Sequence, residues 1–274
     1  MSISEREEHH TENVPIPDNK VGSFVGFVLL SEPNWDKEQF VEDFKKEWGI
    51  VISEDEEAEN PEEENKLLYA VVQGMRVMVG FIDAPVPNGE AEYWAKANFM
   101  WRDGEEIVKK HKAQLVVSII WGDCLDIIEE AKLFVKLTVT ALKQENALAL
   151  YSEGAVYSPE MYCDFAEPMK YGEIPILNLV WLGIYGDENQ IGAYTYGMRR
   201  FGKEEMETYV PRDQNTDLND MRGFLADVAN YVLSEDVTLN DGETIGFSPE
   251  QRLPITLSAG IAVDGNTLKI AYGE

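Results

Sequence analysis

The 274-residue chain carries 51 Asp and Glu residues against 23 Lys and Arg residues, a formal net charge of −28 at pH 7. This imbalance excludes functions that depend on DNA, RNA or anionic lipid, because their phosphates are bound by Lys and Arg. The hydrophobic fraction of 44% is large enough for a substantial core, so the acidity does not indicate global disorder. We therefore expect a folded acidic protein with neither a nucleic-acid partner nor a membrane partner.

The chain also lacks the usual marks of export. Cys124 and Cys163 have neither metal-binding nor redox spacing, and a chain of this length does not need a disulfide. No basic region followed by an apolar run opens the sequence, and no run approaches the ~20 apolar residues of a membrane helix. These features predict a cytoplasmic protein. Residues 1–20 are predicted to form a flexible acidic N-terminal arm.

The first half alternates strand and helix patterns. Apolar residues at helical spacing, including Phe40 and Phe44, predict a helix over 35–48 that begins after Asn34 and stops at Gly49. The other predicted elements are strands over 23–30, 67–73, 75–82 and 113–120 and a helix over 90–101. The element order is β-α-β-β-α-β, which is that of the ferredoxin-like fold.

An acidic run and a long helix punctuate this half. Eight of the twelve residues in 53–64 are acidic, which predicts a solvated loop; the alternative is an electrostatic lure for a basic partner. Apolar and small residues recur on a broad face over 124–144, which predicts a long helix buried between layers.

The second half is predicted to repeat the order. We expect strands over 147–151, 176–185, 191–197, 243–247, 255–263 and 267–272, and helices after Ser158, over 203–209 and over 217–233, the last capped by Thr216.

The predicted fold is therefore α+β, with two ferredoxin-like units in tandem joined by the long helix. Each unit would be an antiparallel sheet with helices packed on one face. The predicted divisions are the arm over 1–20, a first unit over 21–145 that includes the connecting helix, and a second unit over 146–274.

Motifs that carry chemistry are missing from the sequence. There is no phosphate-binding loop, no dinucleotide fingerprint, no H-E-x-x-H, no C-x-x-C and no G-x-S-x-G. We therefore predict no catalytic residue, no metal site and no cofactor.

One candidate binding site surrounds a single histidine. His111 precedes the predicted strand over 113–120 and follows a helix that carries Trp94, Asn98 and Trp101. A functional interpretation makes the imidazole an acid or base in an aromatic pocket. The alternative, which we favour, is a histidine that caps carbonyl groups at a helix end.

A second candidate lies at a predicted strand-to-helix junction. Tyr196 ends the strand, Arg199 and Lys203 supply cations in a chain that has few, and Glu205 follows. Free backbone N–H groups and cations at such a junction could hold an anion or a carboxylate. The alternative is that the cations neutralise the neighbouring acids.

The same stretch carries a resemblance to a known family. The segments that carry it are 26–30, 85–87, Trp101, 111–113, 195–198, 201–203, Glu205, Glu207, 229–232 and 241–246. Through these segments the chain resembles the bacterial family DUF4261 (domain of unknown function four-two-six-one) over about residues 23–272. The family has no established activity, so the resemblance implies no catalytic residue.

Three functional hypotheses remain. The first is a non-enzymatic interaction module, immunity-like in style, that presents an acidic face to a basic partner protein. The alternative is an enzyme that acts on a small metabolite near His111 or at the junction over 199–203. The third is a structural pseudo-dimer without a ligand.

Overall fold

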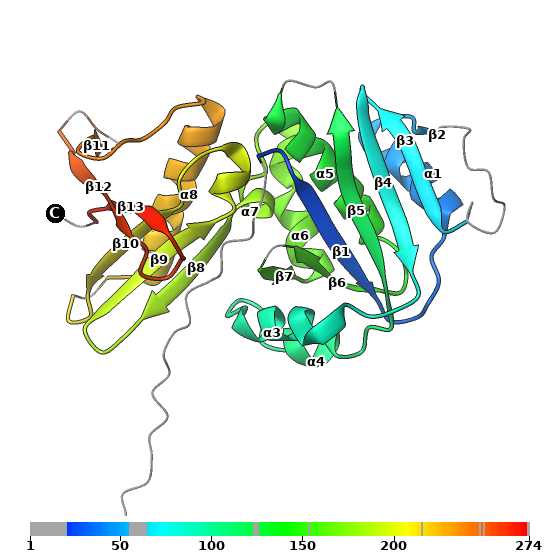
Figure 1. The fold of residues 1–274 in the computed structure, drawn as a ribbon, viewed down its shortest axis with the longest axis horizontal. Coiled ribbons are helices and arrows are strands. Elements are labelled where there is room, and N and C mark those ends of the chain that lie inside the picture. Colours follow the sequence, from blue (N-terminus) through cyan, green and yellow to red (C-terminus); the bar gives the residue numbers. More distant parts are fainter. Residues whose placement is uncertain are drawn as a thin grey trace, which may run out of the picture.

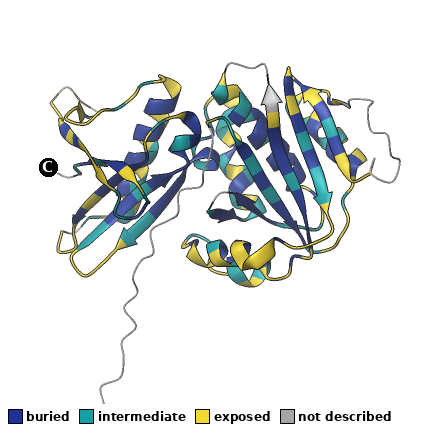
Figure 2. Cartoon of the chain, in the orientation of Figure 1, coloured by how far each residue is buried: buried dark blue, intermediate teal, exposed yellow. Residues whose placement is uncertain are grey.

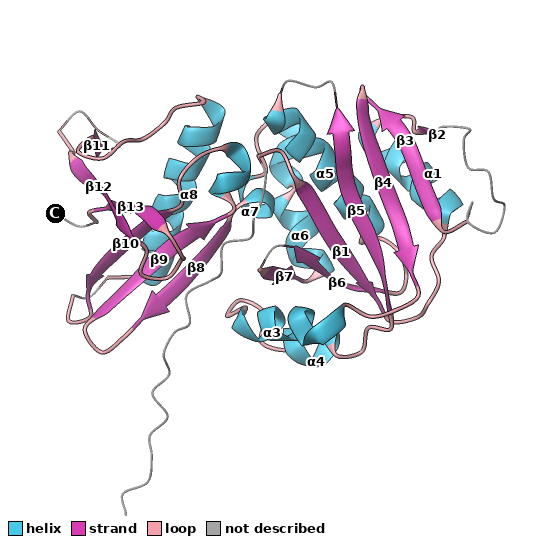
Figure 3. Ribbon diagram, in the orientation of Figure 1, coloured by secondary structure: helices cyan, strands magenta, loops and turns pink. Residues whose placement is uncertain are grey.

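The structure, a computed structural model, describes residues 21–54, 65–122, 126–152, 154–214, 216–246, 248 and 250–272. The predicted arm over 1–20 and most of the acidic run, residues 55–64, lie outside the described residues. The described chain forms two sheets with helices packed against them, which confirms the α+β class (Figures 1 and 3).

The first sheet is antiparallel throughout, with the strand order β2-β3-β4-β5-β1-β6-β7. Its strands are β1 (Phe24–Leu30), β2 (Ser53–Glu54), β3 (Leu67–Val72), β4 (Met75–Ile82), β5 (Ala113–Gly122), β6 (Ala147–Ser152) and β7 (Ala155–Tyr157). A ferredoxin-like unit would place β1 between β4 and β5. Instead β5 lies between β4 and β1, because Ile82 at the end of β4 pairs directly with Gln114 at the start of β5. The predicted ferredoxin-like topology is therefore wrong for this sheet.

Helices cover both faces of the first sheet, not one as expected. They are α1 (Lys37–Trp48), α3 (Glu90–Ala97), α4 (Gly104–Val108), α5 (Ile127–Ala141) and α6 (Pro159–Phe165). Successive side chains of a strand point to opposite faces. In β1, Val28 and Leu30 join the core that includes α1 and α5, whereas Leu29 packs with Ala91 and Val108 of the α3–α4 layer.

The start of α1 differs from the prediction, because a carboxylate caps it. The side chain of Asp36, not Asn34, accepts the N–H of Gln39 and begins α1. Asn34 cannot act as the cap because its carbonyl and its side-chain oxygen accept hydrogen bonds from Asn146 Nδ2. The predicted stop at Gly49 is confirmed, since this residue has a φ of 68° and its N–H donates to Lys45 O.

The second sheet has the order β11-β12-β13-β10-β9-β8, and α8 (Leu218–Ser234) packs on one of its faces. Its strands are β8 (Trp181–Gly186), β9 (Gln190–Tyr196), β10 (Met206–Pro211), β11 (Thr244–Ile245), β12 (Leu253–Ala259) and β13 (Asn266–Ile270). The pair β10–β13 is parallel, so the two sheets do not repeat one topology. A boundary at residues 145/146 would also separate β6 and β7 from the first sheet, which they extend.

Three predictions of secondary structure fail in this half. The first four residues of the expected strand over 176–185 form a short helix, α7 (Ile176–Leu179). The expected helix over 203–209 is largely the strand β10, and α8 is capped by Asp217 where Thr216 was expected. The error in β10 has a physical cause: Met206, Thr208 and Val210 alternate toward α8, and their acidic neighbour Glu207 is buried on the other face.

The two sheets share one continuous hydrophobic core (Figure 2). Phe24 of β1 contacts Phe201 of the single-turn helix η3 (Met198–Phe201), with ring centroids 5.7 Å apart. Tyr157 of β7 lies edge-on to Trp181 of β8, at 5.6 Å. These contacts place η3 and the end of α8 against the start of α5. A groove of about 750 Å³ lies at this place.

Candidate functional site

His111 is buried and both of its ring nitrogens are used within the fold. Its side chain is 1% exposed. Nε2 accepts the N–H of Val86 at 2.9 Å, so Nδ1 carries the hydrogen and donates it to Val108 O at 2.6 Å. The ring therefore fastens the loop before α3 to the end of α4. This geometry favours the interpretation of a histidine that caps a helix end.

The other residues of this candidate site are gathered around the same layer. Asn98 is 4% exposed; its Nδ2 donates to Val156 O at 2.7 Å and its Oδ1 accepts from Met100 N at 2.8 Å. Trp94 and Trp101 are partly buried and pack against the cluster that joins α3 and α4 to the sheet. The structure brings these residues to the same layer, where the polar atoms of His111 and Asn98 bind the protein's own backbone.

The second candidate, the junction after β9, holds a carboxylate that belongs to the chain itself. Glu205 is 2% exposed, and its Oε1 accepts the N–H groups of Gly197 at 2.8 Å and Arg199 at 3.3 Å. Its Oε2 accepts the hydroxyl hydrogen of Thr195 at 2.8 Å. The backbone N–H groups that we expected to bind an external anion therefore bind the carboxylate of Glu205.

The cations of the junction are engaged as well. Arg199 donates to the carbonyl oxygens of Asp264 and Asn266, which anchors the turn before β13. Lys203 Nζ lies 2.8 Å from Asp236 Oδ1, a carboxylate just after α8. Tyr196 is 6% exposed and belongs to the core. The four predicted residues therefore do meet at one junction, where they connect η3, α8 and β13.

Glu207, which the sequence marked only as part of the family resemblance, is a structural residue. It is fully buried, and its carboxylate accepts the N–H groups of Ile261, Ala262 and Val263 at 2.9–3.2 Å. Lys269 Nζ lies 2.7 Å from its Oε2. Successive backbone N–H groups of this kind form an anion-binding concavity. The period-two pattern of Met206, Thr208 and Val210 is the sequence signal that could have placed this residue in a strand.

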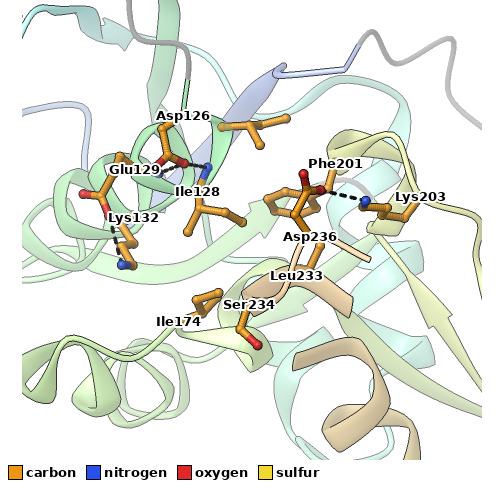
Figure 4. A pocket seen from close by; sticks show the side chains of 11 residues that line it. Asp126, Ile128, Glu129, Lys132, Ile174, Phe201, Lys203, Leu233, Ser234 and Asp236 are labelled. Atoms are coloured by element: carbon orange, nitrogen blue, oxygen red, sulfur yellow. Dashed lines mark hydrogen bonds and ion pairs between the residues drawn. The ribbon is translucent and has the colours of Figure 1, made fainter. Parts of the chain in front are cut away.

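A groove of about 750 Å³ lies between the start of α5 and the end of α8 (Figure 4). Its apolar lining comes from Ile127, Ile128, Ile174, Phe201 and Leu233. Both of its lysines are paired with carboxylates of the same groove, Lys132 with Glu129 at 2.9 Å and Lys203 with Asp236. The groove therefore offers an apolar surface with charged groups that are already balanced.

A second groove, of about 680 Å³, is lined mainly by polar and acidic side chains. We call it the acidic groove. It runs between the loop before α1 and the turn after α5, and its lining residues are Ser31, Glu32, Asn34, Asp36, Gln39, Asp43, Lys143, Gln144, Glu145 and Asn146. Asp43 and Glu145 form no ion pair with any described residue. The only lysine of the lining, Lys143, points to Glu47, with Nζ–Oε2 2.5 Å.

The walls of the acidic groove are fixed by two amides. Gln144 bonds both backbone groups of Asp36, accepting its N–H at 2.7 Å and donating to its carbonyl at 3.0 Å. Asn146 Nδ2 donates to the carbonyls of Glu32 and Asn34 at 2.9 and 2.7 Å. The loop that carries Glu32 and Asp36 is therefore held against the turn after α5.

The described residues lack two features that would point to a metal site or a membrane protein. No group of three or more His, Cys, Asp or Glu side chains is arranged to hold a metal ion within the described part of the chain. None of the helices described is both long enough and apolar enough to cross a membrane.

Comparison with known proteins finds no significant match among curated proteins and none among solved structures. One family model matches residues 194–271, a segment that includes Tyr196, Arg199, Lys203 and Glu205 and most of the second sheet. The N-terminal part of the resemblance lies outside this match and stays a prediction. The matched family is the one that the sequence resembles: residues 194–271 match the model of the family Domain of unknown function (DUF4261).

Proposed function

We propose that the protein is a non-enzymatic binding module that engages a basic partner protein through the acidic groove. The observation that carries the proposal is the charge of this groove. Glu32, Asp36, Asp43 and Glu145 line it, while its only lysine is turned to Glu47. A Lys- or Arg-rich segment would find the carboxylates of Asp43 and Glu145 free of ion pairs with the described residues, whereas Glu32 already pairs with Lys112 at 2.7 Å.

The wall of the acidic groove is fixed in one conformation, which supports a binding role. Because Gln144 and Asn146 fix the loop over 31–36, its carboxylates need little ordering when a partner arrives. Binding to a surface that is already ordered avoids part of the entropy cost of association. The net charge of −28 would in addition speed the encounter with a basic protein at low salt.

The residues at His111 and at the junction over 199–203, which suggested an enzyme, give the binding proposal less direct support. His111, Asn98, Arg199 and Glu205 bind backbone groups of the chain, so no polar atom among these contacts is left aimed at a substrate. One observation favours the alternative of a small-metabolite site: the groove between the sheets includes Phe201 and Lys203 of the predicted junction. A metabolite that bound there would need to displace or share the contact between Lys203 and Asp236.

The proposal is tested by capture followed by titration. The full chain is immobilised, a lysate of its own source organism is passed over it at low salt, and any basic protein retained is purified. That protein is then titrated against the wild type and against the double variant Asp43→Asn/Glu145→Gln. We expect the groove variant to lose about tenfold in affinity, equivalent to about 1.4 kcal/mol.

The matched control is Glu38→Gln/Glu42→Gln, which removes the same charge from exposed positions of α1 outside the groove. We expect its affinity to stay within about twofold of the wild type. Retention of no basic protein at low salt, or an equal loss in both double variants, contradicts the proposal. Saturable binding of a metabolite that depends on Lys203 would favour the alternative.

A further inference from the structure

Over β3, β4 and the adjoining part of β5, the face of the first sheet opposite α1 and α5 is apolar and has no described helix over it. In β3, Leu67, Tyr69 and Val71 point away from the core that includes α1 and α5, because Leu68, Ala70 and Val72 point into it. The same alternation places Met78 and Ile82 of β4 on this open face. Figure 1 shows α1 and α5 behind these strands, with α3 and α4 confined to the end of the sheet near β6 and β7.

The exposed side chains on this face form one surface. Leu67, Val71, Ile82 and Ile120 are 38–44% exposed. The strand register joins them into rows: Leu67 lies opposite Gly80 and then Val116, and Tyr69 lies opposite Met78 and then Ser118. Directly opposed side chains are about 5 Å apart, and diagonal neighbours remain within reach of long side chains. We call this surface, formed by 67, 69, 71, 78, 80, 82, 116 and 120, the open face.

The charge of the open face differs from that of the rest of the molecule. None of the side chains that β3, β4 and β5 direct to it is a carboxylate, although Asp and Glu make up 51 of the 274 residues of the chain. Among the described side chains that these strands direct to this side of the sheet, the charged one is Arg76, near the start of β4 and opposite Val71. Depletion of acids with enrichment of aromatic, Met and Arg residues is the composition of an interface centre.

We propose that the open face packs against the open face of a second copy of this chain, giving a two-fold dimer. The charge selects this occupant. A basic partner would find no carboxylate to pair with here, whereas two copies in face-to-face contact bring neutral apolar surfaces together and leave their acids at the periphery. Sheets pack face to face in this way at about 10 Å in β-sandwiches, and two-fold interfaces use the same patch on both subunits.

The shape of the open face is suited to a contact between two copies of the same surface. A Cβ placed on Gly80 would meet only Leu67 Cδ1, at 3.7 Å, so the centre of the face is shallow. Tyr69 and Met78 stand one row away and are partly exposed. In a two-fold contact, the large side chains of one copy can fill the shallow row of the other.

The mass of the wild-type protein in solution is the first test. Sedimentation or light scattering from about 1 to about 100 µM should give twice the 31.0 kDa of the single chain as concentration rises. The double variant Val71→Glu/Ile120→Glu places acids on half-exposed strand positions and should remain monomeric over this range. The matched control Tyr231→Glu/Leu257→Glu changes two equally exposed apolar residues of the second sheet region and should dimerise like the wild type.

A footprint of the wild type supplies a readout that does not depend on folding of a variant. Oxidative labelling of Met78 and Tyr69 should fall as the concentration rises, whereas labelling of Tyr231 should stay constant. Added salt should strengthen the dimer, because it screens the repulsion between two acidic chains; the same salt should weaken the contact with a basic partner. A monomer at every concentration, or a dimer with unchanged labelling of Met78 and Tyr69, overturns the proposal.

Discussion

The two sheets are stabilised in different ways. The first sheet packs against apolar layers: Phe24, Phe134 and Leu150 are at most 1% exposed, and helices lie on both of its faces except over the open face. The second sheet has a helix on one side, and on the other the buried carboxylate of Glu207 holds the backbone of residues 261–263. A chain with a surplus of acids has thus placed two of them, Glu205 and Glu207, in its interior.

The comparison shows that net charge does not tell where an individual acid lies. A buried carboxylate is tolerated when N–H groups and a cation satisfy it. Glu207 has three backbone donors and Lys269, and Glu205 has two backbone donors and the hydroxyl of Thr195. Four substitutions test this contrast, in order of decreasing effect on stability.

Phe134→Ala should cost about 3–5 kcal/mol of unfolding free energy, because it leaves a cavity in the core of the first sheet. The ring is 1% exposed and stacks on Phe24 with centroids 6.0 Å apart. Urea denaturation measures the change. Tyr171→Ala, at a position that is 83% exposed, is the control and should change stability by less than about 0.5 kcal/mol. A loss below about 1 kcal/mol for Phe134→Ala would show that apolar packing is not what holds this sheet.

Glu207→Gln should cost about 2–3 kcal/mol, because an amide cannot accept all the bonds of the carboxylate and Lys269 loses its partner. The same urea experiment measures it. Glu204→Gln, three positions away in sequence and exposed, is the matched control and should be nearly neutral. If the two variants are equally stable, the second sheet does not depend on the buried carboxylate.

His111→Ala should cost about 1–3 kcal/mol, because the N–H of Val86 and the carbonyl of Val108 lose their buried partner. Binding of the captured basic protein should be unchanged in this variant, since His111 does not line the acidic groove. Thermal unfolding and titration separate the two effects. If His111→Ala keeps the wild-type stability but loses a binding or catalytic activity, His111 has a functional role.

Glu130→Gln should give the smallest effect, and its sign depends on pH. Partial burial, and to a lesser extent the charge of Asp126, raise the pKa of Glu130 above its usual value. A carboxyl group with a raised folded-state pKa favours folding while protonated, and this contribution is lost as pH rises through that pKa. The variant should therefore be slightly more stable than the wild type at about pH 7 and not at about pH 3. A gain of equal size at both pH values would exclude the ionisation of Glu130 as its cause.

Local sequence patterns predicted most helices and strands of this fold, but they did not predict which strands pair. The strands at 24–30 and 113–122 and the helices at α1, α5 and α8 follow from apolar periodicity that the sequence displays. The strand order failed because periodicity does not specify which strands pair. Strand β10 was mistaken for a helix because Lys203, Glu204, Glu205 and Glu207 look like a solvated helical turn unless the burial of two of these acids is known.

The candidate site shows the same limit. Sequence reasoning found the groups that cluster, such as Trp94 with Asn98 and Arg199 with Glu205, because their chemistry is unusual for this chain. It could not find their partners, since Val86, Val156 and Asp264 contribute backbone atoms that carry no sequence signal. The acidic groove was missed because its walls, Glu32 and Glu145, are far apart in the chain.

Glu205 and Glu207, which are buried in the segment that matches DUF4261, are bound by donors of the chain itself. Hydrogen exchange of the backbone amides of Ile261, Ala262 and Val263 is the decisive test of this claim, because their only assigned acceptor among the described residues is Glu207. We expect strong protection in the wild type and a loss of about a hundredfold in Glu207→Gln, with no loss in Glu204→Gln. Rapid exchange in the wild type, or protection unchanged by Glu207→Gln, would contradict the claim.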